Sequence, residues 1–235
     1  HSLDGEPLKL PLQSPFEGEH LDLAHQQLDP GYVLLLSWWL TTEFSAAVTS
    51  INCMHNPLGE GLQVITKVFE ETPRLRTLCG LEEGIETIDW SKSDKGLVEI
   101  ALLAADLKAG RAGAAVARLN MSANMITGST NVGTPFAQYD TDLDGLIALC
   151  DALPALKNPF ELDLSNCGLS VNGVNPVTKA ISAGAAVTSL SLFDNPLTGG
   201  NWDEFAGVEA LFEAMGKSQL QSVNLGKCRL QPDNM

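Results

Sequence analysis

Long hydrophobic runs are absent from this 235-residue chain. The longest apolar stretch, Tyr32 to Leu40, is interrupted by Ser37 and falls short of the ~18 residues that a membrane-spanning helix needs. Basic residues are scarce: 14 Lys and Arg stand against 29 Asp and Glu, a formal net charge of −15. Such a surface repels phosphate backbones and anionic membranes. The sequence therefore argues against a membrane span and against nucleic-acid binding, and it favours a basic protein partner.

The motifs of several catalytic classes are also missing. We find no phosphate-binding glycine loop, no recognisable Ser, His and acid set, and no strong metal-ligand spacing. The five cysteines include no Cys-x-x-Cys pair, and three of them fit packing positions, as expected for free thiols in a reducing compartment. We therefore expect a non-enzymatic, cytoplasmic protein with no catalytic residues and no cofactor. The oligomeric state is left open.

A short apolar phrase, Leu-x-Leu-x-x-polar-x-Leu or a close variant, returns along the whole chain. Successive copies are separated by 30, 37, 31, 43, 28 and 33 residues, and the shortest spacings set a period near 28 to 30. Repetition on this scale predicts a solenoid, in which each unit buries its apolar edge against its neighbours. The copies begin at Leu21, Ile51, Ile88 (a weaker copy), Leu119, Leu162, Leu190 and Val223.

Helical segments alternate with these phrases. Four segments begin with glycine and carry apolar residues at helical spacing, and a fifth contains Trp38 and Trp39. The sequence thus predicts an α/β architecture of about six to seven strand-and-helix repeats. The four glycine-led segments are residues 61–71, 96–107, 145–153 and 207–215.

The period also defines the expected domain organisation. Residues 1–18 show no repeat and are expected to form a lead-in or N-terminal cap, and residues 19–235 a single repeat domain. The period breaks twice: residues 75–90 offer two candidate strands, and the polar excess at about 127–143 predicts an inserted surface loop. Because the chain begins with His1 and stops inside a repeat, we expect an excerpt of a longer protein.

The phrases and their helices, as in DGLIALCDALPALKNPFELDL (residues 144–164), resemble leucine-rich repeat proteins of the ribonuclease-inhibitor-like subclass, also found in NOD-like receptors. The resemblance covers residues 19–235. It implies a curved solenoid with parallel strands on the concave face, helices on the convex face, and a scaffold that binds a protein or peptide. Such repeats also occur in GTPase-activating proteins, for which Arg74, Arg76 and Arg118 are available. A structural subunit of a larger assembly is the third possibility.

Three rows of residues would share the concave face, because alternate residues of a strand point to the same side. The face is polar and modestly acidic. We consider two interpretations, a solvated face without a partner and a groove for a basic ligand, with Asp22, Asp89, Asp163 and Glu161 supplying the field and Phe193 an anchor. The central row is Asp22, Asn52, Asp89, Asn120, Asp163, Ser191 and Asn224.

Asp140, Asp142 and Asp144 have the spacing of a calcium loop, followed by Gly145 and by Asp151 in place of the usual Glu. The repeat register predicts a helix from residue 145, which would carry Asp151 away and make Asp142 or Asp144 a helix cap. The sequence therefore allows a weak calcium site or ordinary capping.

Two further sets of residues have alternative interpretations. Trp38 and Trp39 are predicted either to be buried under the lead-in segment or to dock another subunit. Asn56, Asn124 and Asn195 are expected to bond neighbouring backbone groups, with Cys167 and Cys228 in the equivalent position of other copies.

Overall fold

The computed structural model describes residues 10–12, 14–132, 134, 136–199, 204–228 and 230. The chain forms two compact units, one ending at Glu83 and one beginning at Gly84. The prediction of one repeat domain from residue 19 onward stays a prediction. Among the described residues, no helix combines the length and the apolar character that crossing a membrane requires.

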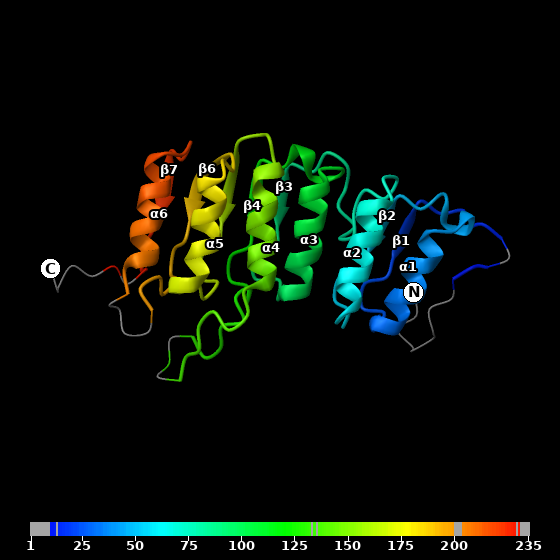
Figure 1. The fold of residues 1–235 in the computed structure, drawn as a ribbon, viewed down its shortest axis with the longest axis horizontal. Helices are drawn as coiled ribbons and strands as arrows, with labels where there is room; N and C mark the ends of the chain where they lie inside the picture. The colour runs from blue at the N-terminus through cyan, green and yellow to red at the C-terminus, as the bar shows by residue number, and fades with distance from the viewer. Residues whose placement is uncertain are drawn as a thin grey trace. The chain divides into compact units, whose positions relative to one another are not determined.

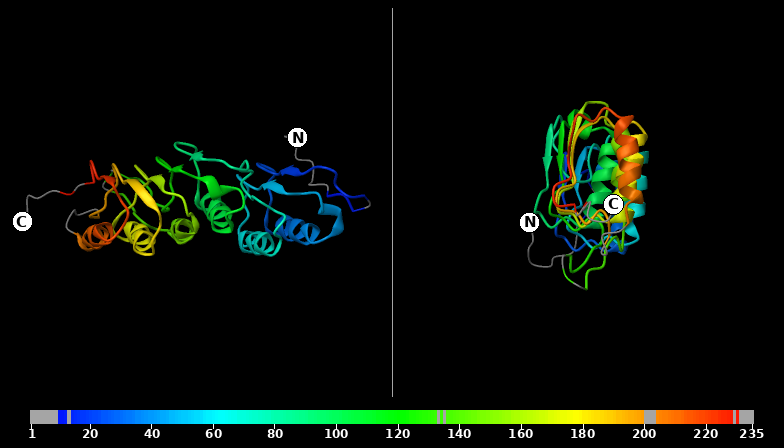
Figure 2. Two further views of the ribbon diagram at one scale, coloured as in Figure 1. Left: turned by 90° about the horizontal axis from the view of Figure 1, so that it is seen from above. Right: turned by 90° about the vertical axis from the view of Figure 1, so that its left-hand side faces the viewer.

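The first unit contains a two-stranded parallel sheet and two helices. Strands β1 (His20–Asp22) and β2 (Ser50–Asn52) pair with Leu21 opposite Ile51. Helices α1 (Pro30–Leu40) and α2 (Gly61–Glu71) pack side by side, and the 3₁₀ helix η1 (Glu43–Ser45) follows α1. Both helices lie on the same side of the sheet (Figures 1 and 2).

The second unit contains a five-stranded parallel sheet whose strand order follows the sequence. The strands are β3 (Thr87–Asp89), β4 (Arg118–Asn120), β5 (Phe160–Asp163), β6 (Val187–Ser191) and β7 (Ser222–Asn224). The helices are α3 (Leu97–Ala109), α4 (Asp144–Ala152), α5 (Val171–Ser182) and α6 (Ala206–Gly216), with the 3₁₀ helices η2 (Gly113–Ala115) and η3 (Leu153–Ala155). Helices α3 to α6 lie in a row on one side of the sheet (Figures 1 and 2).

The mixed α/β prediction with parallel strands is confirmed. Each copy of the phrase coincides with a strand, and within each sheet equivalent first core residues lie opposite one another, as Leu119 does with Leu162. Of the two candidate strands between residues 75 and 90, the second contains β3, whereas Thr77 and Cys79 form only isolated bridges. Helix α5 was not predicted, because it begins with valine and contains Pro176.

The segment between β4 and α4 contains the predicted insertion. Its described residues include no helix or strand, only a bridge between Thr130 and Gln138. The segment extends past the ends of the neighbouring helices (Figure 1). An insertion at about 127–143 is thus accommodated outside the sheet and the helix row, as expected for surplus residues in a tightly packed fold.

A buried asparagine connects the ends of neighbouring strands. The Asn195 side-chain amide donates to the carbonyl oxygens of Leu164 (2.8 Å) and Leu192 (2.9 Å). Its oxygen accepts the backbone N–H groups of Cys167 and Leu169, both at 3.0 Å. One buried side chain therefore satisfies four buried backbone groups that have left the strand ladder.

The same arrangement recurs in both units. Asn56 bridges to the backbone of Leu23 and Leu28, and Asn124 to that of Trp90 and Lys95. Where the position is cysteine, the thiol donates instead, from Cys167 to the Met121 carbonyl oxygen and from Cys228 to that of Leu192. The expected structural role of these asparagines and cysteines is therefore observed.

All five cysteines are buried free thiols. Burial raises the pKa of the Cys167 thiol to about 12 and also raises the pKa values of Cys150 and Cys228. These three side chains therefore remain protonated at neutral pH, which suits them to packing and to weak hydrogen bonding.

Glycines at the helix starts allow close packing of neighbouring helices. A Cβ atom at Gly61 would lie 2.7 Å from the Cβ of Val33 in α1, and one at Gly207 would lie 2.6 Å from a side-chain carbon of Val174 in α5. Neither position has room for a larger side chain. The glycines that marked α2 and α6 in the sequence are thus explained by packing.

We expect Asn195→Ala to lower the free energy of unfolding by about 2–4 kcal/mol, because it leaves several buried backbone groups without partners. Asn195→Cys should lose less, because a thiol already serves at the equivalent positions 167 and 228. Urea unfolding followed by circular dichroism measures both variants. An unchanged midpoint for Asn195→Ala would contradict the role assigned to this amide.

Candidate binding surfaces

The Asp and Asn residues of the predicted central row share one local interaction. In each case the side-chain oxygen accepts the backbone N–H of the residue two positions later, which turns the chain out of the strand. The distances lie between 2.9 and 3.2 Å. The donors and acceptors are Ala24 to Asp22, Met54 to Asn52, Ser91 to Asp89, Ser122 to Asn120, Ser165 to Asp163, and Gly226 to Asn224. These six side chains therefore form turns that end the strands.

Acidic residues of the row are separated by neutral ones. Asn120 lies between Asp89 and Asp163 in the sheet, and Ser191 lies on the other side of Asp163. This order avoids like charges directly opposite each other on neighbouring strands. The hydrogen bonds from Ser91, helped by the charge of Arg118, lower the pKa of Asp89, so the carboxylate is ionised at neutral pH.

Nearby basic groups offset part of the acidic field on the face. Glu161 lies 3.9 Å from the guanidinium of the half-exposed Arg118 on the neighbouring strand. The predicted anchor Phe193 is half-buried, and the Lys227 ammonium lies 5.2 Å from its ring centre. In the second unit this face is therefore polar and mixed in charge, and the predicted anchor Phe193 already has a cationic neighbour.

The two tryptophans of α1 have different environments. Trp39 is fully buried, its indole N–H donates to the Pro11 carbonyl oxygen (2.9 Å), and its ring packs edge-on against Phe16, with centres 6.2 Å apart. Trp38 keeps 52% of its surface exposed. Burial under the lead-in segment therefore holds for Trp39, and Trp38 is accessible.

Trp38 belongs to a larger apolar surface on α1. Leu34 is 61% exposed, Leu35 43% and Tyr32 37%. We call these four residues, Tyr32, Leu34, Leu35 and Trp38, the α1 face. The sequence indicated an apolar helix but did not distinguish this face from the core-facing residues Val33, Leu36 and Leu40.

Asp140 caps a helix that lies 30 residues further along the chain. Its carboxylate oxygens accept the N–H groups of Ser170 (3.1 Å) and Gly173 (2.8 Å), at the start of α5. A Cβ atom at Gly173 would lie 2.6 Å from this carboxylate, so glycine is needed for the approach. Burial raises the pKa of Asp140, and the N–H donors of α5 act in the opposite direction.

The other aspartates of the candidate calcium set serve α4. Asp142 accepts the backbone N–H of Asp144 at 3.1 Å, and Asp144 is the first residue of the helix. Asp151 lies near the far end of α4, 2.8 Å from the Lys179 ammonium. In the described part of the chain, no group of three His, Cys, Asp or Glu residues could hold a metal ion. Asp140 therefore caps α5, and Asp142 bonds the first residue of α4. The N-cap position of α4 is Leu143, whereas Asp144 places a negative charge in its first turn.

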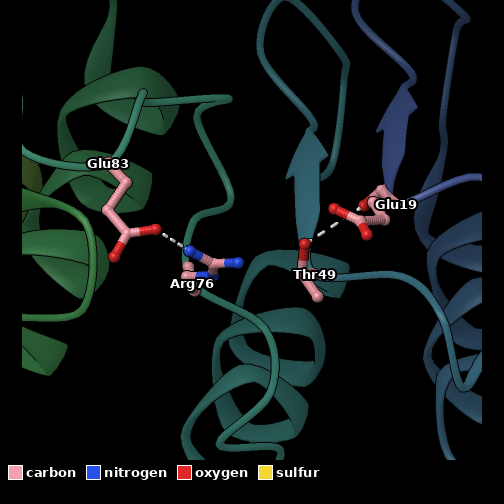
Figure 3. A network of polar contacts seen from close by, with 4 residues as sticks. All are labelled: Glu19, Thr49, Arg76 and Glu83. Carbon is pink, nitrogen blue, oxygen red and sulfur yellow. Dashed lines mark hydrogen bonds and ion pairs between the residues drawn. The ribbon is translucent and has the colours of Figure 1, made fainter.

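The three arginines considered for a GTPase-activating role have partners within the chain. Arg74 donates to the Leu40 carbonyl oxygen (2.7 Å) at the end of α1, and Arg118 lies beside Glu161 as described above. Arg76 pairs with Glu83, as Figure 3 shows together with the contact from the Thr49 hydroxyl to the Glu19 carbonyl oxygen. None of these contacts gives the GTPase-activating alternative further support.

Searches against protein-family models and curated protein sequences find no match to this chain. The resemblance to ribonuclease-inhibitor-like repeats therefore rests on the phrases and helices of the chain itself.

We expect Asp140→Ala to destabilise the protein by about 1 kcal/mol, the usual cost of losing a helix cap, and to speed amide hydrogen exchange at the start of α5. Asp144→Ala is the matched control. It also removes an aspartate at a helix start, but the backbone N–H groups of Ser170 and Gly173 bond to Asp140 instead. If added calcium raised the melting temperature of the wild type and not that of Asp140→Ala, the calcium interpretation would replace capping.

Proposed function

We propose that this chain is a non-enzymatic leucine-rich repeat scaffold of the ribonuclease-inhibitor-like subclass, with six to seven repeats in a curved solenoid, that binds a protein partner. The in-phase pairing of equivalent residues and the recurring asparagine bridge support the repeat assignment. Rigid arrays of this kind bind by presenting a preformed surface, which lowers the ordering cost of association.

The observation that carries the binding role is the exposed α1 face. Large apolar side chains that remain grouped on a surface mark interaction sites more often than they mark ordinary solvated surface. Trp and Tyr, both present here, are the residue types most enriched among side chains that dominate binding energy. Of the two surfaces predicted from the sequence, the structure favours this end over the strand face, where the acidic and aromatic residues already have local partners.

The same observation keeps one alternative in consideration. A structural subunit of a larger assembly would also bury the α1 face, against a permanent neighbour rather than an exchanging partner. We propose a cytoplasmic location for either role, because five buried free thiols suit a reducing compartment.

Site-specific photo-crosslinking in native extract tests the binding role. A benzophenone amino acid at position 34 should yield one dominant crosslinked protein, and the same group at position 163 on the strand face should yield much less of it. Dominant crosslinking from position 163 would assign binding to the strand face instead. Absence of crosslinks from both positions would contradict a protein-binding role for either surface.

A further inference from the structure

We propose that the α1 face binds an amphipathic helix of a partner protein, with an apolar ridge flanked by Lys or Arg side chains. This inference rests on the proposed protein-binding function and specifies the kind of partner.

The α1 face differs from the exposed surface of the other described α-helices. Helix α1 contains no charged residue, whereas each of the other α-helices exposes at least one, namely Lys67, Glu70 and Glu71 in α2, Lys108 in α3, Asp144 and Asp151 in α4, Lys179 in α5, and Glu209 and Glu213 in α6. An exposed helix surface normally carries such charges. Solvation alone therefore does not account for the composition of α1.

The position of the face on α1 suits a second helix. Val33 packs toward α2, against Gly61. Because each residue turns a helix by about 100°, Leu35 and Trp38 lie on the side of α1 that is turned away from α2. Leu34 and Trp38, one turn apart, form a ridge of the kind that fits the groove of a packed helix. A partner helix would thus extend the α1 and α2 layer of this unit by one member.

The surroundings of the face set the charge of the partner. The described residues of the first unit include ten Asp and Glu against three Lys and Arg, a net charge of −7. Exposed carboxylates stand at both ends of α1, Asp29 as its N-cap and Glu43 just beyond its last turn. Two of the three basic side chains, Arg74 and Arg76, are engaged within the unit. An apolar ridge with Lys or Arg beside it complements this pattern.

A second copy of this chain fits the face poorly. Two copies would each bring a charge of −15, so their approach is repulsive at low ionic strength. The four side chains of the face are also few beside the roughly 20–30 residues per partner in a stable protein interface. A short basic helix requires less area and is attracted by the same charge.

The test uses a synthetic 18-residue helical peptide with leucines at helical spacing and lysines beside them, and a matched peptide with glutamates in place of the lysines. Fluorescence anisotropy measures binding of each to the whole chain. We expect the lysine peptide to bind, the glutamate peptide not to bind, and the Leu34→Ser/Trp38→Ser variant to weaken binding roughly tenfold or more. Added salt should weaken binding further.

Matched controls separate site binding from general attraction to an acidic protein. Ile147→Ser/Phe212→Ser removes two exposed apolar side chains from α4 and α6 and, like the α1 variant, leaves the net charge at −15. It should bind the lysine peptide as the wild type does. Equal binding by the wild type and the α1 variant, or equal binding of both peptides, would overturn the inference.

Two further outcomes would contradict the basic-helix partner in different ways. A dimer of the chain alone in sedimentation equilibrium, lost in Leu34→Ser/Trp38→Ser, would overturn the inference in favour of a second copy. A partner crosslinked from position 34 that contacts α1 through something other than a basic helix would overturn it while leaving the proposed binding function in place. Failure of the binding function itself would appear as the absence of crosslinks.

Discussion

The need to satisfy backbone polar groups at the strand ends governs the rest of this structure. The strands are short, so after three to five residues each chain segment leaves the ladder and its backbone groups need other partners. A buried asparagine amide, with two donors and one acceptor oxygen, can serve both the segment that it follows and the one beside it. Asn195 does so with four bonds of 2.8 to 3.0 Å. That geometry keeps neighbouring copies of the phrase in register, so that equivalent core residues, such as Leu119 and Leu162, lie opposite each other.

This constraint also determines which polar residues remain available for binding. Asp and Asn recur on the strand face because their oxygens close a turn onto the second residue after them, as Asp163 does with Ser165. A pattern that the sequence presents as a row of candidate ligands is in large part a device for ending strands. Polar repetition along the strands is therefore weaker evidence of a binding site than the unexplained apolar surface on α1.

The sequence predicts those features whose cause is local. The apolar phrase locates every strand, and residues 61–71, chosen for their leading glycine and helical spacing, coincide with α2. The sequence did not predict helix α5, because it contains Pro176 and does not begin with glycine. The cap that Asp140 provides could not be inferred, because its partners lie 30 and 33 residues away and depend on how the insertion folds back. Trp38 and Trp39 differ for a similar reason, since adjacent helical residues point about 100° apart and only the packed structure shows which one faces the core.

The acidity of the chain and the exposed face of α1 are best understood together. An uncovered apolar surface favours self-association, and a net charge of −15 opposes it by repelling further copies before contact. Asp29 and Glu43 place negative charges at the two ends of α1, with the exposed apolar side chains between them. On the proposed function, the same charge distribution opposes the approach of further copies of the chain and favours a basic partner. A neutral chain with this face would self-associate more readily and would lack the attraction for a basic partner, so the proposal assigns the negative charge a role in binding as well as in solubility.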